Sequence, residues 1–189
     1  MKRILFVCTG NTCRSPMAEA LFKDIARKRG LQVEVRSAGV SAVDGIPMSR
    51  HSSTVLRENQ ISETITSNRA TRELAEWADL ILTMTSSHKR TMLQIHPGAV
   101  DKTYTLKEYV EDGGQGLESI LELEGFYTDL QLKKALGQEI TREEKIRLRR
   151  MEQSVPDYDI IDPFGGSVEM YRRCAEEIRE ALEKLADRL

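Results

Sequence analysis

The sequence contains no long apolar run. No segment of the 189 residues approaches the roughly 20 apolar residues that a membrane-spanning helix needs. The apolar run near the N-terminus, residues 4–7, is far shorter than the apolar core of a secretory signal. We therefore expect a cytoplasmic protein that does not bind membranes.

Neither sign of charge is in excess. Lys and Arg number 28, Asp and Glu number 30, and the formal net charge is −2. A chain with this charge balance has no overall positive electrostatic field that would attract nucleic acid. We expect no nucleic-acid partner, and any anion must be bound by groups that lie close to it.

Cysteine and histidine are also scarce. Three cysteines are too few for a disulfide framework, so we expect free thiols. The three histidines form no i,i+4 pair and have no cysteine nearby, which gives no support to a metal site. We expect neither a metal nor another cofactor, and a monomer is the default state.

Short apolar runs alternate with helical patterns in the first half of the chain. Strands are predicted at residues 4–7, 33–36, 80–84 and 100–106, and helices at 14–29, 49–59, from Thr71 and at 86–95. Gly30 stops the first helix, and Pro97 stops the last of these. The alternation predicts an α/β fold, with a parallel sheet covered by helices on both faces.

The C-terminal residues form the clearest helical pattern. Apolar side chains recur every three or four residues over positions 168–189, and Ser167 is the predicted N-cap. The pattern lasts only about three heptads, which favours packing on the sheet over a coiled-coil dimer.

The stretch that follows the fourth predicted strand has a different character. Three glycines within residues 113–116 form a break, and eight of the twelve residues at 139–150 are charged. Thr141 and Glu144 have the spacing of a capping box, which predicts a solvated helix. We expect one domain over the whole chain (1–189), with a charged, partly helical insertion at about 111–157.

The end of the first predicted strand carries the clearest chemical signal. Cys8 follows the strand, and Arg14 lies six positions later, where a helix opens. The carboxyl end of a parallel strand and the N-terminus of a helix both favour anions. The loop between them can curl its backbone N–H groups around a tetrahedral oxyanion, with Gly10 at the sharp bend and Asn11 in a left-handed conformation.

Cys8 and Arg14 have complementary chemistry. The planar guanidinium of Arg14 can hold two phosphate oxygens. An arginine and a helix N-terminus favour the thiolate form of a nearby cysteine, and a thiolate is a nucleophile suited to phosphorus. We expect Cys8 to attack a phosphoryl group and form a phosphocysteine. The alternative is a buried structural cysteine and an ordinary surface arginine.

Three motifs resemble the low-molecular-weight protein tyrosine phosphatase family. VCTGNTCRSP at residues 7–16 is similar to its phosphate-binding loop, RSAG at 36–39 to the segment after its second strand, and DPFGGS at 162–167 to its acid loop. The resemblance covers about residues 1–110 and 158–189. It implies a flavodoxin-like three-layer fold with a central four-stranded parallel sheet. It also implies a substrate-binding loop made of Thr9, Gly10, Asn11, Thr12 and Cys13.

The resemblance also implies a proton donor. Asp162 would protonate the leaving group and then deprotonate the attacking water. Asp157 and Asp159 are rivals for this role, but neither is followed by the proline and aromatic residue of the family's acid loop. Phe164, that aromatic residue, would lie beside the substrate.

Residues around the loop are implied to support it. Ser15 would hydrogen-bond the thiolate, and Asn11 and Ser37 would brace the loop. The family often places a histidine in a loop after its second helix to complete this network, whereas residues 65–69 contain none.

Thr12 distinguishes between two substrates. Tyrosine phosphatases of the family usually have an aliphatic residue at this position, and the motifs CTGNTCRS and DPFGGS resemble those of bacterial protein-arginine phosphatases. A hydroxyl beside the leaving atom suits a polar guanidinium better than an aromatic ring. Residues 40–46 also lack an aromatic side chain that could flank a phenyl ring. We predict phosphorylated protein substrates that carry phosphoarginine, with phosphotyrosine as the alternative.

Two other readings and one redox role stay open. An arsenate reductase uses the same loop but needs further thiols, and the distant one is Cys174, on the apolar stripe of the last helix. The protein could also be a non-catalytic phosphate-binding module. Because Cys8, Arg14 and Asp162 are all present, these groups would then have to lie too far apart for catalysis. Cys13 is a candidate redox partner that could form a reversible disulfide with Cys8; the alternative for Cys13 is a packed small side chain.

Overall fold

The computed structural model describes residues 1–112, 117–154 and 156–189. The chain divides into two compact units. The larger unit joins Met1–Val110 to Tyr158–Leu189, and the smaller unit is Glu111–Asp157.

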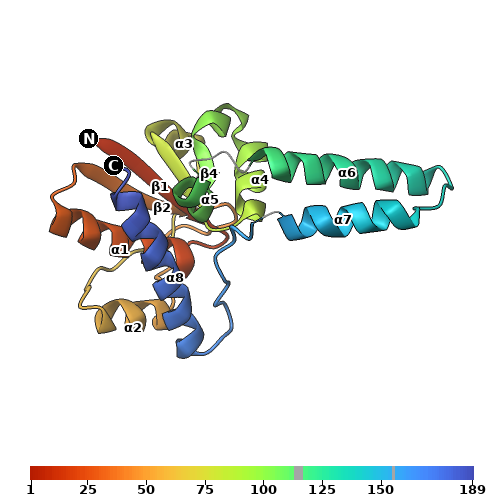
Figure 1. Cartoon of the computed structure of the whole chain (residues 1–189). Coiled ribbons are helices and arrows are strands. Elements are labelled where there is room, and N and C mark those ends of the chain that lie inside the picture. The colour runs from red at the N-terminus through yellow and green to blue at the C-terminus, as the bar shows by residue number, and fades with distance from the viewer. Residues whose placement is uncertain (113–116, 155) are drawn as a thin grey trace. The chain divides into compact units, whose positions relative to one another are not determined.

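A four-stranded sheet forms the centre of the larger unit (Figure 1). The strands are β1 (Lys2–Cys8), β2 (Val33–Gly39), β3 (Leu80–Thr83) and β4 (Thr103–Thr105). They lie in the order β2-β1-β3-β4, and every neighbouring pair is parallel. The carboxyl ends of all four strands therefore lie along one edge, where α/β proteins bind their ligands.

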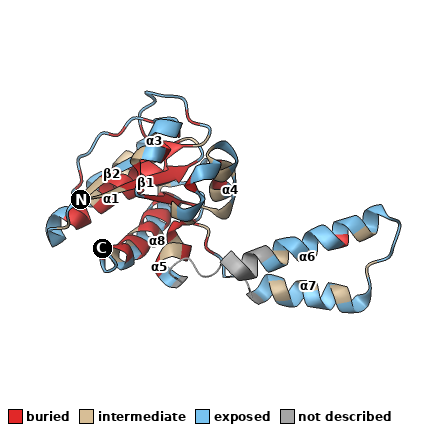
Figure 2. Cartoon of the chain, turned by 90° about the horizontal axis from the view of Figure 1, so that it is seen from above, coloured by how far each residue is buried: buried red, intermediate tan, exposed pale blue. Residues whose placement is uncertain are grey.

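Helices cover both faces of this sheet. They are α1 (Arg14–Arg29), α2 (Arg50–Glu58), α3 (Arg72–Trp77), α4 (Ser86–Ile95), the 3-10 helix η1 (Pro97–Lys102), α5 (Leu106–Asp112) and α8 (Val168–Ala186). Ile4 and Phe6 of β1 pack with residues of α1, α2, α5 and α8, whereas Leu5 and Val7 pack on the other face with α3, α4 and η1. Figure 2 shows buried residues concentrated in the sheet and on α1 and α8. The predicted three-layer α/β fold is confirmed.

Local sequence signals set most of the helix ends. Gly30 ends α1 with a left-handed φ of 69°, which glycine adopts without a steric cost. The side chains of Ser49 and Thr71 each accept a backbone hydrogen bond in the first turn of α2 and α3. Pro97 directly follows the residue after α4. These ends agree with the predicted ones.

The predicted bounds of the fourth strand are wrong. The strand predicted at residues 100–106 is reduced to the three residues of β4, because Pro97–Lys102 form η1 and α5 begins at Leu106. Proline in the first turn favours such a helical start. Ser167 is the N-cap of α8, as predicted, although within the described residues its side chain accepts no capping hydrogen bond. The last residue, Leu189, lies beyond α8.

The smaller unit contains two helices that pack against each other, α6 (Leu117–Ala135) and α7 (Arg142–Ser154) (Figure 1). The guanidinium of Arg147 lies 4.7 Å from the centre of the Phe126 ring. No helix in the described part of the chain is long and apolar enough to cross a membrane.

The capping box predicted for α7 is present. The backbone N–H of Thr141 donates to Glu144 Oε2 (2.8 Å), and the N–H of Glu144 donates to Thr141 Oγ1 (3.2 Å). Glu144 also pairs with Lys133 of α6 at 2.6 Å. The predicted glycine break at 113–116 lies outside the described residues.

Candidate active site

The loop between β1 and α1 curls back toward Cys8. Cys8 ends β1, and Arg14 begins α1. Asn11 lies between them in a left-handed conformation, with φ of 54°. This conformation lets the backbone N–H of Asn11 donate to Cys8 Sγ over 3.3 Å. The sulfur therefore faces the concave side of its own loop.

The end of β2 lies directly against this loop. A Cβ atom at Gly39 would lie 2.4 Å from the carbonyl oxygen of Thr9 and 2.9 Å from the backbone nitrogen of Asn11. The next residues tie the strand to the loop, because Val40 N donates to Cys8 O (3.0 Å) and Ser41 N donates to Thr9 O (2.9 Å). Only glycine leaves room for this approach.

The side chain of Asn11 joins four parts of the chain. It is fully buried, and its Nδ2 donates to Ser15 Oγ (2.8 Å) and to Ser37 Oγ (2.9 Å). Its Oδ1 accepts from the backbone N–H of Asn68 (2.7 Å). The 65–69 stretch, which contains no histidine, thus joins the network through a backbone N–H group. We call Asn11, Ser15, Ser37 and Asn68 the bracing network.

Two donors face the sulfur of Cys8, whose residue is only 3 % exposed. One is the Asn11 N–H, and the other is the hydroxyl of Ser15, whose Oγ lies 2.9 Å from Sγ. Ser15 Oγ is farther, at 3.3 Å, from the carbonyl oxygen of Ala38. Both groups are placed to hydrogen-bond the sulfur when it carries negative charge.

Arg14 links this loop to the acid loop. Its Nη2 donates to Asp162 Oδ2 (2.8 Å) and its Nη1 to the carbonyl of Ile160 (3.4 Å). Its Nε is buried and has no acceptor among the described residues. A buried N–H group without an acceptor is costly, and an oxyanion bound in the loop would supply one. Asp162 itself is half-exposed and also accepts from Phe164 N (3.1 Å), which closes a tight turn.

A pocket of about 300 Å³ opens at the carboxyl end of β1. It is lined by residues of both loops: Cys8, Thr9, Gly10, Thr12, Cys13, Arg14, Asp162 and Phe164. Thr12 is half-buried in its wall, and Phe164 is 80 % exposed. Every predicted site residue therefore lies in this pocket or in the bracing network. No cluster of metal-ligating side chains occurs in the described ranges.

Residues 3–140 match the family model described as low molecular weight phosphotyrosine protein phosphatase. The chain belongs to this family. It is 39% identical over 186 residues to the protein-arginine-phosphatase of Bacillus subtilis (strain 168), covering 98% of this chain and 95% of that protein. It is 31% identical over 185 residues to the tyrosine phosphatase PtpB of Staphylococcus aureus (98% and 97%). Among solved structures, YwlE arginine phosphatase from Geobacillus stearothermophilus matches with a TM-score of 0.73 and 36% identity, covering 100% and 92%.

The predicted family is thus confirmed, and the chain is a cysteine-based protein phosphatase. The resemblance to its arginine-phosphatase members, inferred above from the two loop motifs, agrees with these relatives.

The phosphatase carries a second thiol in its pocket. Cys13 is buried, and its Sγ lies 3.3 Å from the hydroxyl of Tyr171 on α8. Burial and the contact with Cys13 raise the pKa of Tyr171 to about 12, so its hydroxyl stays protonated. Cys8, Cys13 and Cys174 are all free thiols.

Asp159, one of the rival acids, has a different position from Asp162. Its Oδ1 accepts from both the backbone N–H (2.7 Å) and the hydroxyl (2.9 Å) of Ser86, the first residue of α4. A carboxylate at a helix N-terminus is stabilised by the helix dipole. Asp159 thus ties the acid loop to α4 and does not line the pocket.

His88 is a pocket neighbour that the sequence did not reveal. Its Nε2 lies 2.7 Å from Thr9 Oγ1, and its Nδ1 lies 2.9 Å from Thr85 Oγ1. Burial, and then the charge of Arg14, lower the pKa of His88 to about 4. The spacing of Thr85 and His88 at the start of α4 marks a helix cap, but nothing in the sequence places His88 beside Thr9.

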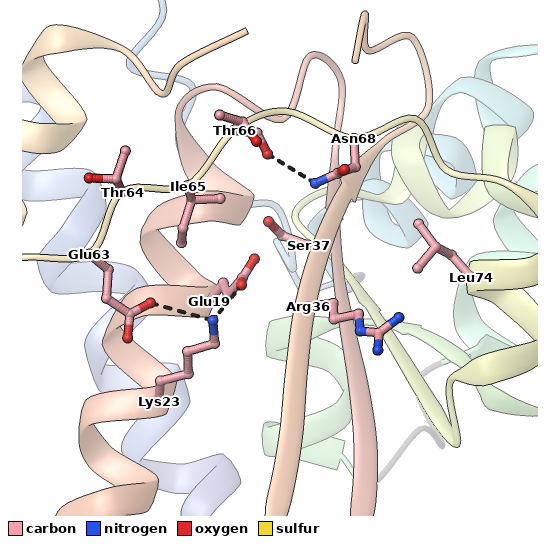
Figure 3. A pocket seen from close by; sticks show the side chains of 10 residues that line it. All are labelled: Glu19, Lys23, Arg36, Ser37, Glu63, Thr64, Ile65, Thr66, Asn68 and Leu74. Carbon is pink, nitrogen blue, oxygen red and sulfur yellow. Dashed lines mark hydrogen bonds and ion pairs between the residues drawn. The ribbon is translucent and has the colours of Figure 1, made fainter. Parts of the chain in front are cut away.

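A second cavity, of about 380 Å³, borders the bracing network and is shown in Figure 3. Ser37 and Asn68 line it, and Lys23 bridges Glu19 (2.7 Å) and Glu63 (3.4 Å) on its other side. Neither Cys8 nor Asp162, the predicted nucleophile and acid, lines this larger cavity, whereas both line the smaller pocket.

Proposed function

We propose that this phosphatase hydrolyses phosphoarginine side chains of proteins, with Cys8 as nucleophile, Arg14 as phosphate ligand and Asp162 as acid and base. The observation that carries the proposal is the convergence of these three groups on one pocket whose wall includes the hydroxyl-bearing Thr12. Its relatives include enzymes named protein-arginine-phosphatase.

In the first step, Cys8 Sγ attacks phosphorus while the P–N bond to the guanidinium breaks. The loop N–H groups and Arg14 hold the equatorial oxygens, and Arg14 Nε gains the acceptor that it lacks among the described residues. Phosphate oxygens take the place of Asp162 on Arg14, and the freed carboxyl must carry a proton for the next transfer. Asp162 then gives its proton to the departing nitrogen.

In the second step, water attacks the phosphorus of phosphocysteine. Asp162, now a carboxylate, takes a proton from that water, and the S–P bond breaks to release inorganic phosphate. The electron pair returns to Cys8 Sγ, where the hydroxyl of Ser15 and the N–H of Asn11 stabilise the thiolate. Cys8 is thereby ready for another substrate.

The walls of the pocket support phosphoarginine over phosphotyrosine. Thr12 presents a hydroxyl where an aliphatic side chain would favour an aromatic leaving group. Phe164 is the one aromatic residue that lines the pocket among the described residues. A phenyl ring would therefore have an aromatic neighbour on one side only.

Two other reaction classes fit less well. Arsenate reduction would need a thiol that relays oxidation outward, but Cys174 is fully buried, and burial raises the pKa of its thiol to about 12. A neutral buried thiol is a poor nucleophile. A non-catalytic phosphate-binding module would not need an acid beside Arg14, whereas Asp162 lies 2.8 Å from it.

We further propose that the enzyme works as a single phosphatase domain in the cytoplasm, with residues 111–157 as an insertion. Every proposed site residue lies in the larger unit. A reducing compartment keeps a catalytic thiol active, and all three cysteines are free.

The test is a paired assay of peptides that carry phosphoarginine or phosphotyrosine, with Cys8→Ser as the inactive control. We expect at least tenfold higher kcat/KM for phosphoarginine, and we expect Thr12→Ile to shift the ratio toward phosphotyrosine by about tenfold or more. A large wild-type preference for phosphotyrosine would refute the substrate assignment and leave the cysteine mechanism intact.

A further inference from the structure

The imidazole of His88 connects the active-site loop to the N-terminus of α4. The residue is 6 % exposed, and its two ring nitrogens lie 2.7 Å from Thr9 Oγ1 and 2.9 Å from Thr85 Oγ1. Thr9 directly follows the nucleophile and lines its pocket. We propose that His88 is a positioning residue that fixes the Thr9 hydroxyl, and with it the first turn of the phosphate-binding loop. This inference rests on the proposed function.

The direction of the two hydrogen bonds follows from their partners. A neutral imidazole has one donor nitrogen and one acceptor nitrogen. Thr85 Oγ1 already accepts from the backbone N–H of His88 (3.2 Å), so its own hydrogen is free to point at Nδ1. Nε2–H then donates to Thr9 Oγ1. The hydroxyl hydrogen of Thr9 is left available to a phosphoryl oxygen in the pocket.

Thr9 is held at two points. Its carbonyl oxygen accepts from Ser41 N (2.9 Å), and its hydroxyl meets His88. The backbone contact fixes the peptide plane, and the His88 contact fixes the side chain. Loss of either hydrogen-bonding partner would free the residue that follows Cys8.

The same short segment also holds the acid loop. Residues 84–88, the β3–α4 junction, contact that loop at two places: Met84 O accepts from Ile160 N (2.8 Å), and Ser86 binds Asp159 Oδ1. The junction contacts the nucleophile loop through His88. Because one rigid segment at a helix start binds both loops, it sets the position of Asp162 relative to Cys8 in addition to the direct contact through Arg14.

A double-mutant cycle tests whether His88 acts through Thr9. The variants are Thr9→Val, His88→Ala and their combination, made in the full-length protein. For each we measure the affinity for inorganic phosphate by calorimetry, and kcat and KM for a phosphoarginine peptide. We expect each single change to weaken phosphate binding and to lower kcat about tenfold. The double variant should bind phosphate as tightly, and turn over as fast, as the more impaired of the two single variants.

Two controls separate positioning from general stability. His88→Gln retains an N–H donor that can reach Thr9, and it should recover phosphate affinity to within about threefold of wild type. His96→Ala removes another histidine of the same unit that hydrogen-bonds a backbone carbonyl, Ala70 O at 3.3 Å, and should leave both readouts unchanged. Urea unfolding monitored by Trp77 fluorescence confirms that each variant is folded.

Additive losses in the cycle, or unchanged phosphate affinity in His88→Ala, would overturn the assignment. The phosphate measurement needs no turnover, so it decides the role of His88 even if neither phosphopeptide is hydrolysed. Absence of hydrolysis by wild type contradicts the proposed function, whereas normal hydrolysis with an additive cycle contradicts only the positioning role.

Discussion

The two units of this chain differ in how their side chains are held. In the larger unit, the core residues of β1 are fully buried, and the active-site loop has hydrogen-bonding partners in β2, α4 and the 65–69 stretch. In the smaller unit, Leu130 is buried, but Leu132, Leu136 and Ile146 are each more than 40 % exposed. Local caps and charge pairs hold α6 and α7.

This difference separates what catalysis requires from what a surface helix requires. A nucleophile, an arginine and an acid must keep their distances, so the larger unit connects them through contacts between distant parts of the chain. The smaller unit has no such requirement, and its order arises from residues near one another in sequence. Substitutions should therefore have large effects in the first unit and small effects in the second.

The largest expected effect is that of Cys8→Ser. A serine hydroxyl at neutral pH is a much weaker nucleophile than a thiolate, so kcat should fall by about 10⁴-fold or more. Inorganic phosphate should still bind, because Arg14 and the loop N–H groups remain. Retention of substantial turnover would remove Cys8 from the mechanism.

Asp162→Asn should come next. Without a proton donor, kcat on substrates with poor leaving groups should fall by roughly two to four orders of magnitude. Asp159→Asn is the comparison variant, since that carboxylate binds Ser86 and only helps to hold the acid loop; it should lower stability by about 1 kcal/mol and reduce kcat much less than Asp162→Asn does. If the two variants lost activity equally, the acid would not be Asp162 alone.

Two glycine substitutions compare the units directly. Gly39→Ala places a Cβ 2.4 Å from Thr9 O, and should lower the free energy of unfolding by about 1–3 kcal/mol as well as activity. Gly125→Ala in α6 meets no atom within 4 Å and should stabilise that helix by about 0.5–1 kcal/mol. Trp77, the single tryptophan, reports unfolding of the larger unit, and circular dichroism reports the helices. If Gly39→Ala and Gly125→Ala changed stability equally, the difference between the two units would be contradicted.

Acid should weaken the larger unit, which contains all three histidines. The pKa of His88 is lowered from 6.5 to about 4 by burial and by Arg14, although Asp159 and Asp162 oppose that shift. Between these values the unfolded chain binds a proton that the folded chain does not, so stability falls as the pH decreases from 6.5 toward 4. The loss should be smaller in His88→Gln. Urea midpoints across this pH range measure it, and identical pH profiles would contradict the prediction.

The smallest effect should follow removal of the insertion. Replacing residues 111–157 by a short glycine–serine linker should change kcat/KM for a phosphopeptide by less than about threefold, because no proposed site residue is removed. Whole phosphoproteins should be affected to the same extent. A selective loss with whole proteins would identify the insertion as a docking surface for substrates.

The sequence alone determined the features that depend on near neighbours. The helical repeat of α1, its stop at Gly30, the caps at Ser49 and Thr71, and the Cys8 to Arg14 spacing are all local. The fourth strand was predicted too long, because strand-favouring Val, Thr and Tyr residues at 100–106 do not show where the 3-10 turn that Pro97 begins gives way to a strand.

Only the tertiary structure decided which distant groups meet at the site. His88 reaches Thr9 across 79 positions, Asn68 reaches Asn11 across 57, and Asp159 reaches Ser86 across 73. No periodicity or cap in the sequence encodes such pairs, since they arise when parallel strands bring their carboxyl ends to one edge. The residues proposed to perform the chemistry could thus be predicted from their motif, whereas the contacts that position them required the fold.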